Sequence, residues 1–116
     1  MRSTKEVLDH HLTAFGNADL EGVLSDYTDD AVLFTPNGPL KSQAERKPMF
    51  EAFFEEFAKP GTSFALKHES VVGDYAYMIW TADTADNLYD VMSDMFVVRN
   101  GKIVAHCFGG KIAPKR

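Results

Sequence analysis

The sequence predicts an α+β protein whose helices come first in the chain and pack on one face of an antiparallel sheet. In the first half, apolar residues recur at helical spacing behind capping signals, whereas the second half consists of strand-like runs separated by tight turns. No internal repeat, low-complexity tract or linker interrupts the 116 residues. We therefore expect a single domain spanning residues 1–116, long enough to bury a core of its own.

Caps indicate the first two helices. Ser3 and Glu6 have the spacing of a capping box, and the apolar stripe that follows also contains His11. Gly16-Asn17 ends this helix, and Asp19 is placed to cap a short second one. The apolar positions of the two helices are Val7, Leu8, Leu12, Phe15, Leu20, Val23 and Leu24.

A short strand and a third helix follow. The apolar run Ala31–Thr35 ends at a turn rich in proline, asparagine and glycine. Ser42 and Glu45 repeat the capping-box spacing, but Pro48 is unfavourable inside a helix. We expect either a kink at Pro48 or a helix that starts at Lys47 with the proline in its first turn. Its aromatic stripe is Phe50, Phe53, Phe54 and Phe57.

The second half contains four expected strands, Ser63–Val72, Tyr75–Asp83, Leu88–Val98 and Lys102–Ile112. Both faces of the third of these are apolar, with Leu88, Met92, Phe96 and Val98 on one face and Tyr89, Val91, Met95 and Val97 on the other. Helices on one side of the sheet would leave the second face in water. We therefore expect a homodimer that buries this face.

Composition restricts the function classes. A net charge of −5 argues against a nucleic-acid partner, which needs clustered Lys and Arg. The single cysteine, Cys107, is typical of a reducing compartment. No apolar run approaches the roughly 20 residues of a spanning helix, and the N-terminus lacks the apolar core of a signal peptide. We expect a cytoplasmic protein with no membrane partner and, without a Gly-rich phosphate loop, no nucleotide cofactor.

Asp94 is the most informative residue because it places a carboxylate inside an otherwise apolar strand. Burying an ionised carboxylate without partners costs free energy, so Asp94 is either exposed or has a functional role. The next strand carries His106. Together with His11, these residues form a legitimate metal ligand set, but no clustered spacing supports one and we expect no metal.

Whether Asp94 and His106 share a face depends on the turn between their strands. A two-residue Asn-Gly turn pairs Arg99 with Lys102 and turns His106 outward, away from the face of Asp94. A three-residue loop pairs Val98 with Lys102 and sets Asp94 opposite His106. Hydrophobicity does not decide between the two.

Two stretches of sequence, residues 26–34 and residues 96–104, resemble the nuclear transport factor 2-like superfamily, as does the order of the elements. Ketosteroid isomerases and SnoaL-like polyketide cyclases belong to this superfamily. The resemblance implies a cone-shaped, curved sheet wrapped around three N-terminal helices, a pocket at its open end, and a dimer. It also favours the three-residue loop, which makes His106 face inward.

This sequence matches only one of the three ketosteroid-isomerase site positions compared. Asp94 matches the family's protonated aspartic acid, which donates a hydrogen bond to the developing enolate. Thr35 stands where the general-base aspartate belongs, and His11 stands where the oxyanion-hole tyrosine belongs. Because the base is missing, we do not expect steroid isomerisation by that mechanism.

The predicted function is the binding of a small apolar or aromatic molecule in an aromatic cup. Cofactor-free isomerisation, cyclisation, hydration or dehydration would follow there, with Asp94 as acid or orienting group and His106 or His11 as base. The expected ligand-binding residues are Phe15, Thr35, Phe53, Trp80 and Phe108. The alternative is a non-catalytic binding or dimerisation module in which these polar groups are structural. We expect His10 to face solvent and Tyr27 to pack between helices.

Overall fold

The computed structural model describes residues 1–115, so Arg116, the last residue of the expected domain, lies outside the described residues. This part of the chain has the predicted α+β class. Its helices are α1 (Thr4–Gly16), α2 (Leu20–Ser25) and α3 (Gln43–Phe57). Its strands are β1 (Tyr27–Thr35), β2 (Gly38–Leu40), β3 (Ser63–Val72), β4 (Tyr75–Asp83), β5 (Asn87–Arg99) and β6 (Lys102–Pro114).

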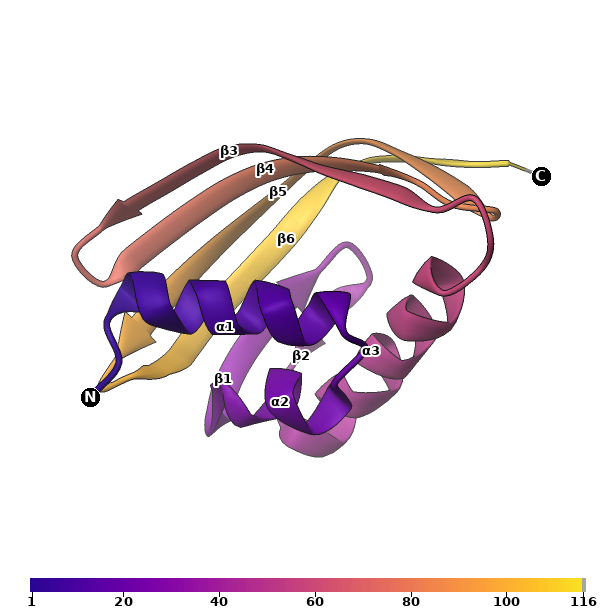
Figure 1. Cartoon of the computed structure of the whole chain (residues 1–116). Helices are drawn as coiled ribbons and strands as arrows, with labels where there is room; N and C mark the ends of the chain where they lie inside the picture. The colour runs from indigo at the N-terminus through magenta and orange to yellow at the C-terminus, as the bar shows by residue number, and fades with distance from the viewer. Residues whose placement is uncertain (116) are drawn as a thin grey trace.

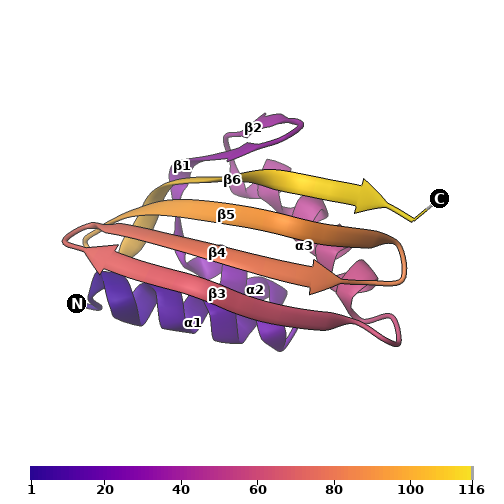
Figure 2. The ribbon, with the colours of Figure 1, turned by 90° about the horizontal axis from the view of Figure 1, so that it is seen from above.

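The strands form one curved, unclosed sheet in the order β2-β1-β6-β5-β4-β3. Figure 1 shows the long strands arching over α1, with α2 and α3 on the same side. The opposite face, seen in Figure 2, carries no helix within residues 1–115. β1 pairs with β6 in parallel, and the short β2, which sequence patterns did not indicate, pairs antiparallel with β1. The sheet is therefore mixed, not purely antiparallel.

Both predicted N-cap residues, Ser3 and Ser42, mark the starts of their helices, but only Ser3 forms a full capping box. The Ser3 hydroxyl accepts from the Glu6 backbone N–H, and the Glu6 side chain accepts from the Ser3 backbone N–H. The Ser42 hydroxyl accepts from the Glu45 backbone N–H, but the Glu45 side chain accepts from the Lys41 backbone N–H and not from that of Ser42. α3 therefore begins at Gln43, and the alternative start at Lys47 is wrong. Pro48 lies early in α3, where its missing N–H forfeits a single intrahelical bond.

The turn between β5 and β6 is the two-residue form, so the favoured three-residue loop is wrong. Arg99 pairs with Lys102, and both Asn100 and Gly101 have positive φ, at 53° and 74°. These angles are those of the hairpin turn that an Asn-Gly sequence favours.

A β-bulge nevertheless turns His106 inward. Ile103 pairs with Val98 but Ala105 pairs with Val97, which leaves Val104 as the extra residue on β6. Beyond this bulge His106 pairs with Phe96, and its side chain lies on the same face as Asp94. The expected common face therefore exists, but through a bulge and not through the loop.

A second bulge exchanges the faces at the start of β5. Asp90 is the extra residue between the pairs of Tyr89 and Val91. Leu88 is consequently 40% exposed and Tyr89 only 3% exposed, the reverse of the predicted faces. β4 keeps its alternation, and Trp80 points inward.

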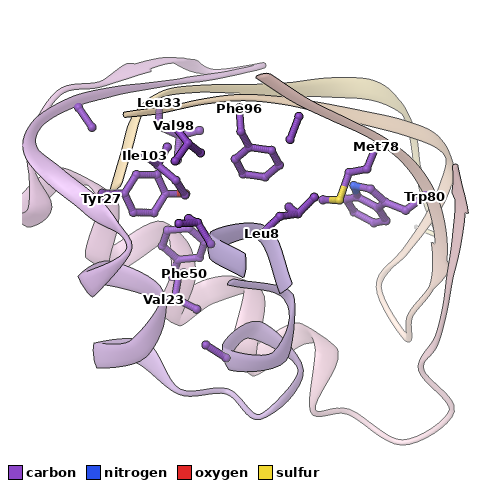
Figure 3. Close-up of a cluster of buried hydrophobic side chains, with 14 of the residues drawn as sticks. Leu8, Val23, Tyr27, Leu33, Phe50, Met78, Trp80, Phe96, Val98 and Ile103 are labelled. Carbon is purple, nitrogen blue, oxygen red and sulfur yellow. The ribbon is translucent and has the colours of Figure 1, made fainter. Parts of the chain in front are cut away.

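The core lies between the concave face of the sheet and the helices. Figure 3 shows Phe96, Val98, Leu33 and Ile103 pointing down from the strands toward Leu8 and Val23 on the helices. Each large apolar side chain buried in this way stabilises the fold by about 1.5–3 kcal/mol relative to exposure. This layer fixes the spacing between the sheet and α1.

Candidate functional site

A cavity of about 330 Å³ opens between α1, α3 and the concave face of the sheet. Its walls are apolar and mostly aromatic: Leu12, Phe15, Met49, Phe50, Phe53, Phe57, Phe64, Met78, Trp80, Phe96 and Phe108. Three polar side chains reach it, and they are His11, Asp94 and His106. The volume is in the range of pockets that enclose small organic molecules.

Asp94 is held by two nitrogen donors. The Trp80 indole N–H donates to Asp94 Oδ1 at 2.7 Å, and His106 Nε2 lies 2.7 Å from Oδ2. Asp94 is only 6% exposed, so most of its bonding must come from these partners. Two donors, one on each oxygen, are the arrangement that suits an ionised carboxylate in an apolar wall.

His106 lies flat against Phe96, with ring centroids 4.0 Å apart and the planes 25° from parallel. Burial lowers the pKa of His106, against the opposing effect of Asp94. A neutral imidazole then has its proton on Nε2, where it donates to Asp94. Nδ1 is left as an acceptor for the Tyr27 hydroxyl at 2.8 Å.

Tyr27 begins β1, and its ring contacts α1 through His11 and α3 through Phe50, as expected of a residue packed between helices. Its ring stacks on His106, and the Arg46 guanidinium lies 4.9 Å from the ring centroid. Burial, with a smaller contribution from the charge of Asp94, raises the pKa of Tyr27 well above its ordinary value. Tyr27 is therefore a neutral hydroxyl that can both donate and accept.

His11 connects this group to a buried carboxylate. His11 Nδ1 lies 3.1 Å from Asp26 Oδ2, and Nε2 lies 3.5 Å from the Tyr27 oxygen. Asp26 is 0% exposed and also contacts Arg2 at 3.1 Å and His10 at 2.7 Å. Burial raises the pKa of Asp26, but His11, Arg2 and His10 outweigh this, so the pKa lies below its ordinary value.

The structure brings most of the predicted residues to one cavity. Asp94, His106 and His11 line it, as do Phe15, Phe53, Trp80 and Phe108. Thr35 does not line the cavity. Its hydroxyl instead donates to the Gly38 carbonyl at 2.9 Å and accepts from the Asn37 N–H at 3.0 Å. Thr35 closes the β1–β2 turn because the chain reverses directly after it.

Tyr27 and Asp26 were missed as members of the site. Their neighbours in space come from α1 and β6, and the parallel pairing of β1 with β6 is not visible in any local pattern. The one available signal was a tyrosine beside an aspartate, three residues before an apolar run. His10, expected to face solvent, has a side chain that is 44% exposed and bonds to Asp26.

Among residues 1–115, no group of three or more His, Cys, Asp or Glu side chains is placed to hold a metal ion. Within the same residues, no helix has the length and apolar character needed to cross a membrane.

The fold and the cavity define the class of protein. A curved sheet folded over three helices is the architecture of the nuclear transport factor 2-like superfamily, which the sequence already resembled. An NTF2-like protein of unknown function from Burkholderia pseudomallei superposes with a TM-score of 0.78 at 15% identity, over 96% of this chain and 92% of that one. A cystatin-fold protein from Novosphingobium aromaticivorans gives a TM-score of 0.75 at 18% identity, over 94% and 99% of the two chains.

Within this class the family is settled by sequence. Residues 8–106 match the SnoaL-like domain, so the chain belongs to the SnoaL-like family. IdmH from Streptomyces antibioticus, a proposed polyketide cyclase, has the same fold, with a TM-score of 0.76 at 16% identity over 95% of this chain and 93% of that one. No curated protein matches this chain significantly.

Proposed function

We propose that this protein encloses a small, flat, largely hydrophobic molecule and carries out cofactor-free acid–base chemistry on it. The reaction class is isomerisation, cyclisation, hydration or dehydration. One observation supports this most strongly: Asp94, a carboxylate with two nitrogen donors, is set into the wall of an aromatic cavity. An apolar cavity with few convergent polar groups is the usual form of a small-molecule site.

Asp94 is the group that meets the ligand. Both ring nitrogens of His106 have partners, whereas each Asp94 oxygen uses one lone pair and keeps another. Asp94 accordingly acts as the base, taking a proton from a carbon beside a carbonyl or from a hydroxyl and returning it to another atom. His106 and Trp80 are positioning residues that hold the carboxylate. These roles differ from those first expected from the sequence, in which Asp94 was the acid or orienting group and His106 or His11 the base.

The likeness to IdmH, a proposed polyketide cyclase, favours cyclisation within this reaction class. Cyclisation of a polyketide-like chain needs proton removal next to a carbonyl and a cavity that shapes the chain. The first requirement suits Asp94 and the second suits the phenylalanine walls.

Exchange of carbon-bound protons tests this proposal without knowledge of the natural substrate. β-Tetralone is a flat, aromatic ketone with acidic protons beside its carbonyl, and its deuterium uptake in deuterium oxide is followed by NMR. We expect the protein to accelerate exchange, and Asp94→Asn to reduce the acceleration by roughly 10²–10⁴-fold, the usual contribution of a general base. Asp90→Asn, the same change at an exposed site on β5, is the matched control and should keep the wild-type rate.

The rival function is a non-catalytic binding module of the same fold. Trp80 is the single tryptophan and lines the cavity, so its fluorescence reports occupancy directly. Binding of β-tetralone, seen as a saturable change in this fluorescence, combined with exchange at the uncatalysed rate would favour the rival. Binding with Asp94-dependent exchange would favour the enzyme.

We further propose that the protein acts as a homodimer in the cytoplasm. A row of side chains crosses the helix-free face of the sheet through paired positions on four strands, and we call it the outer row: Phe34, Cys107, Met95 and Tyr77. Phe34 is 53% exposed and Met95 41% exposed. A free, exposed cysteine in this row suits a reducing compartment.

A further inference from the structure

Three buried side chains connect Asp94 to a second carboxylate, that of Asp26 at the C-cap of α2. His106 Nδ1 lies 2.8 Å from the Tyr27 hydroxyl, which lies 3.5 Å from His11 Nε2. His11 Nδ1 then lies 3.1 Å from Asp26 Oδ2. Asp94 stands at one end of this series and Asp26 at the other, so two imidazoles and one phenol separate two carboxylates.

The proton count along this series allows two arrangements. Tyr27 has one hydroxyl proton and an imidazole nitrogen on each side of it. If His11 carries both of its protons, it donates to Asp26 and to the Tyr27 oxygen, and Tyr27 donates to His106. If His106 carries both of its protons, it donates to Asp94 and to Tyr27, and Tyr27 donates to His11. Every donor faces an acceptor in both arrangements.

We propose that Tyr27 is a proton bridge through which one positive charge moves between His11, beside Asp26, and His106, beside Asp94. In the step, the Tyr27 hydroxyl proton passes to His106 Nδ1 while the His11 Nε2 proton passes to the Tyr27 oxygen. His106 gains a proton, His11 loses one, and Tyr27 ends with the same number. The inference rests on the proposed function for its use: it supplies positive charge to the base when negative charge develops on the ligand.

The surroundings of Tyr27 suit a bridge. Arg46 over its ring and the stacked His106 ring fix its position, and Phe50 packs on it with centroids 6.1 Å apart. The phenol keeps a proton throughout, because burial opposes its ionisation. Tyr27 is not among the residues that line the cavity, so a ligand in the cavity leaves its hydroxyl in place.

Charged groups bias the two ends of the series. On the outer side, Asp26 attracts charge to His11, while Arg2 and His10 partly neutralise that carboxylate. On the inner side, Asp94 attracts charge to His106, and Arg46 opposes positive charge near Tyr27.

Nitrogen NMR of histidine-labelled protein tests the bridge. The protein has four histidines, and exposed His68 serves as the internal reference. We expect the Nδ1 shift of His106 to show a step at the pH where His11 titrates, in addition to any step of its own. Tyr27→Phe removes only the hydroxyl, and in it the shared step should disappear and His106 Nδ1 should move downfield toward the value of an unbonded lone pair.

Tyr89→Phe is the matched control, because it removes another buried hydroxyl, bonded to Glu56, that lies off the series. The shared step should survive in this variant. Independent titration of His11 and His106 in the wild-type protein would overturn the bridge, and that measurement needs no variant to fold. Persistence of the shared step in Tyr27→Phe would overturn it as well. Neither readout requires turnover, so the bridge and the proposed function can fail separately.

Discussion

Burial favours the neutral form of His106, and this gives stability a dependence on pH. Its pKa in the folded protein lies below the ordinary value of 6.5, because burial disfavours the charged ring. Below pH 6.5 the unfolded chain therefore binds a proton that the folded protein does not, so the stabilisation is complete above pH 6.5 and is lost as pH falls through the lower folded value.

We expect the free energy of unfolding to fall below pH 6.5 with a contribution of at most about 1.4 kcal/mol per pH unit from His106. Urea unfolding at a series of pH values measures it. His106→Gln should show a shallower slope, whatever its absolute stability, and His68→Gln at an exposed site should keep the wild-type slope. Equal slopes in all three proteins would show that His106 binds protons alike in the folded and unfolded states.

Residue types, together with the family resemblance, predicted many of the side chains that line the cavity. An acid in an apolar strand and a histidine in the next strand do lie 2.7 Å apart, and four of five expected ligand-binding residues line the cavity. Thr35, which stands where the family's general base belongs, does not line the cavity because its hydroxyl bonds within the β1–β2 turn. Tyr27 and Asp26 could not be found because their partners are brought near by long-range pairing.

Bulges, which add one residue to a strand, decided which side chains face the cavity. The β6 bulge at Val104 turns His106 inward, and the β5 bulge at Asp90 turns Tyr89 inward. A one-residue slip reverses every side chain beyond it. Alternation in sequence cannot locate such a slip when both faces are apolar, as they are in β5, and the predicted faces failed there for this reason.

Gly110 allows β5 and β6 to approach beside the β5 bulge. Its φ is +153°, and an added Cβ would lie 2.0 Å from the Val91 carbonyl oxygen and 2.8 Å from Met92 Cα. Backbone atoms cannot move aside cheaply, so Gly110→Ala should destabilise the protein by about 3 kcal/mol or more in urea unfolding. Gly109→Ala meets nothing within 4 Å and should change stability by no more than about 0.5 kcal/mol. Equal effects would contradict this account of the strand contact.

Arg46 joins α3 to β1. It is 0% exposed and donates to the Ala31 carbonyl at 2.6 Å and the Thr28 carbonyl at 3.0 Å. Arg46→Met keeps the apolar stem but leaves both carbonyls without this donor, and should lower the free energy of unfolding by about 3 kcal/mol. Lys47→Met, at the next and exposed position, is the control and should stay within about 0.5 kcal/mol. If Arg46→Met left the free energy of unfolding unchanged, water would be replacing the guanidinium as the donor to the two carbonyls.

Over residues 1–115, helices cover one face of the sheet and not the other, as Figures 1 and 2 show. If the outer row is a dimer interface, Met95→Glu places a charge at its centre and should convert a dimer to a monomer in sedimentation velocity at micromolar protein. Ala52→Glu, on the exposed surface of α3, should leave the dimer intact. A wild-type protein that sediments as a monomer at that concentration would rule out the proposed dimer.

The α+β class and the superfamily could be predicted from the sequence because caps, turns and element order all agree. β3 and β4 have the expected bounds, whereas β5 and β6 extend further than their apolar runs. The parallel pairing of β1 with β6 could not be predicted from local sequence patterns, since it joins segments far apart in the chain. Local chemistry therefore predicted the elements, and long-range pairing determined how the site is assembled.

Deuterium exchange into β-tetralone, with cavity occupancy followed through Trp80 fluorescence, tests the role of Asp94 most directly. At saturation, the wild-type protein and Asp90→Asn should exchange the ketone's protons well above the uncatalysed rate. Asp94→Asn should bind the ketone with similar affinity and exchange it roughly 10²–10⁴-fold more slowly. A saturated wild-type protein that leaves the protons to exchange at the solution rate, or an Asp94→Asn variant as fast as wild type, would contradict the account.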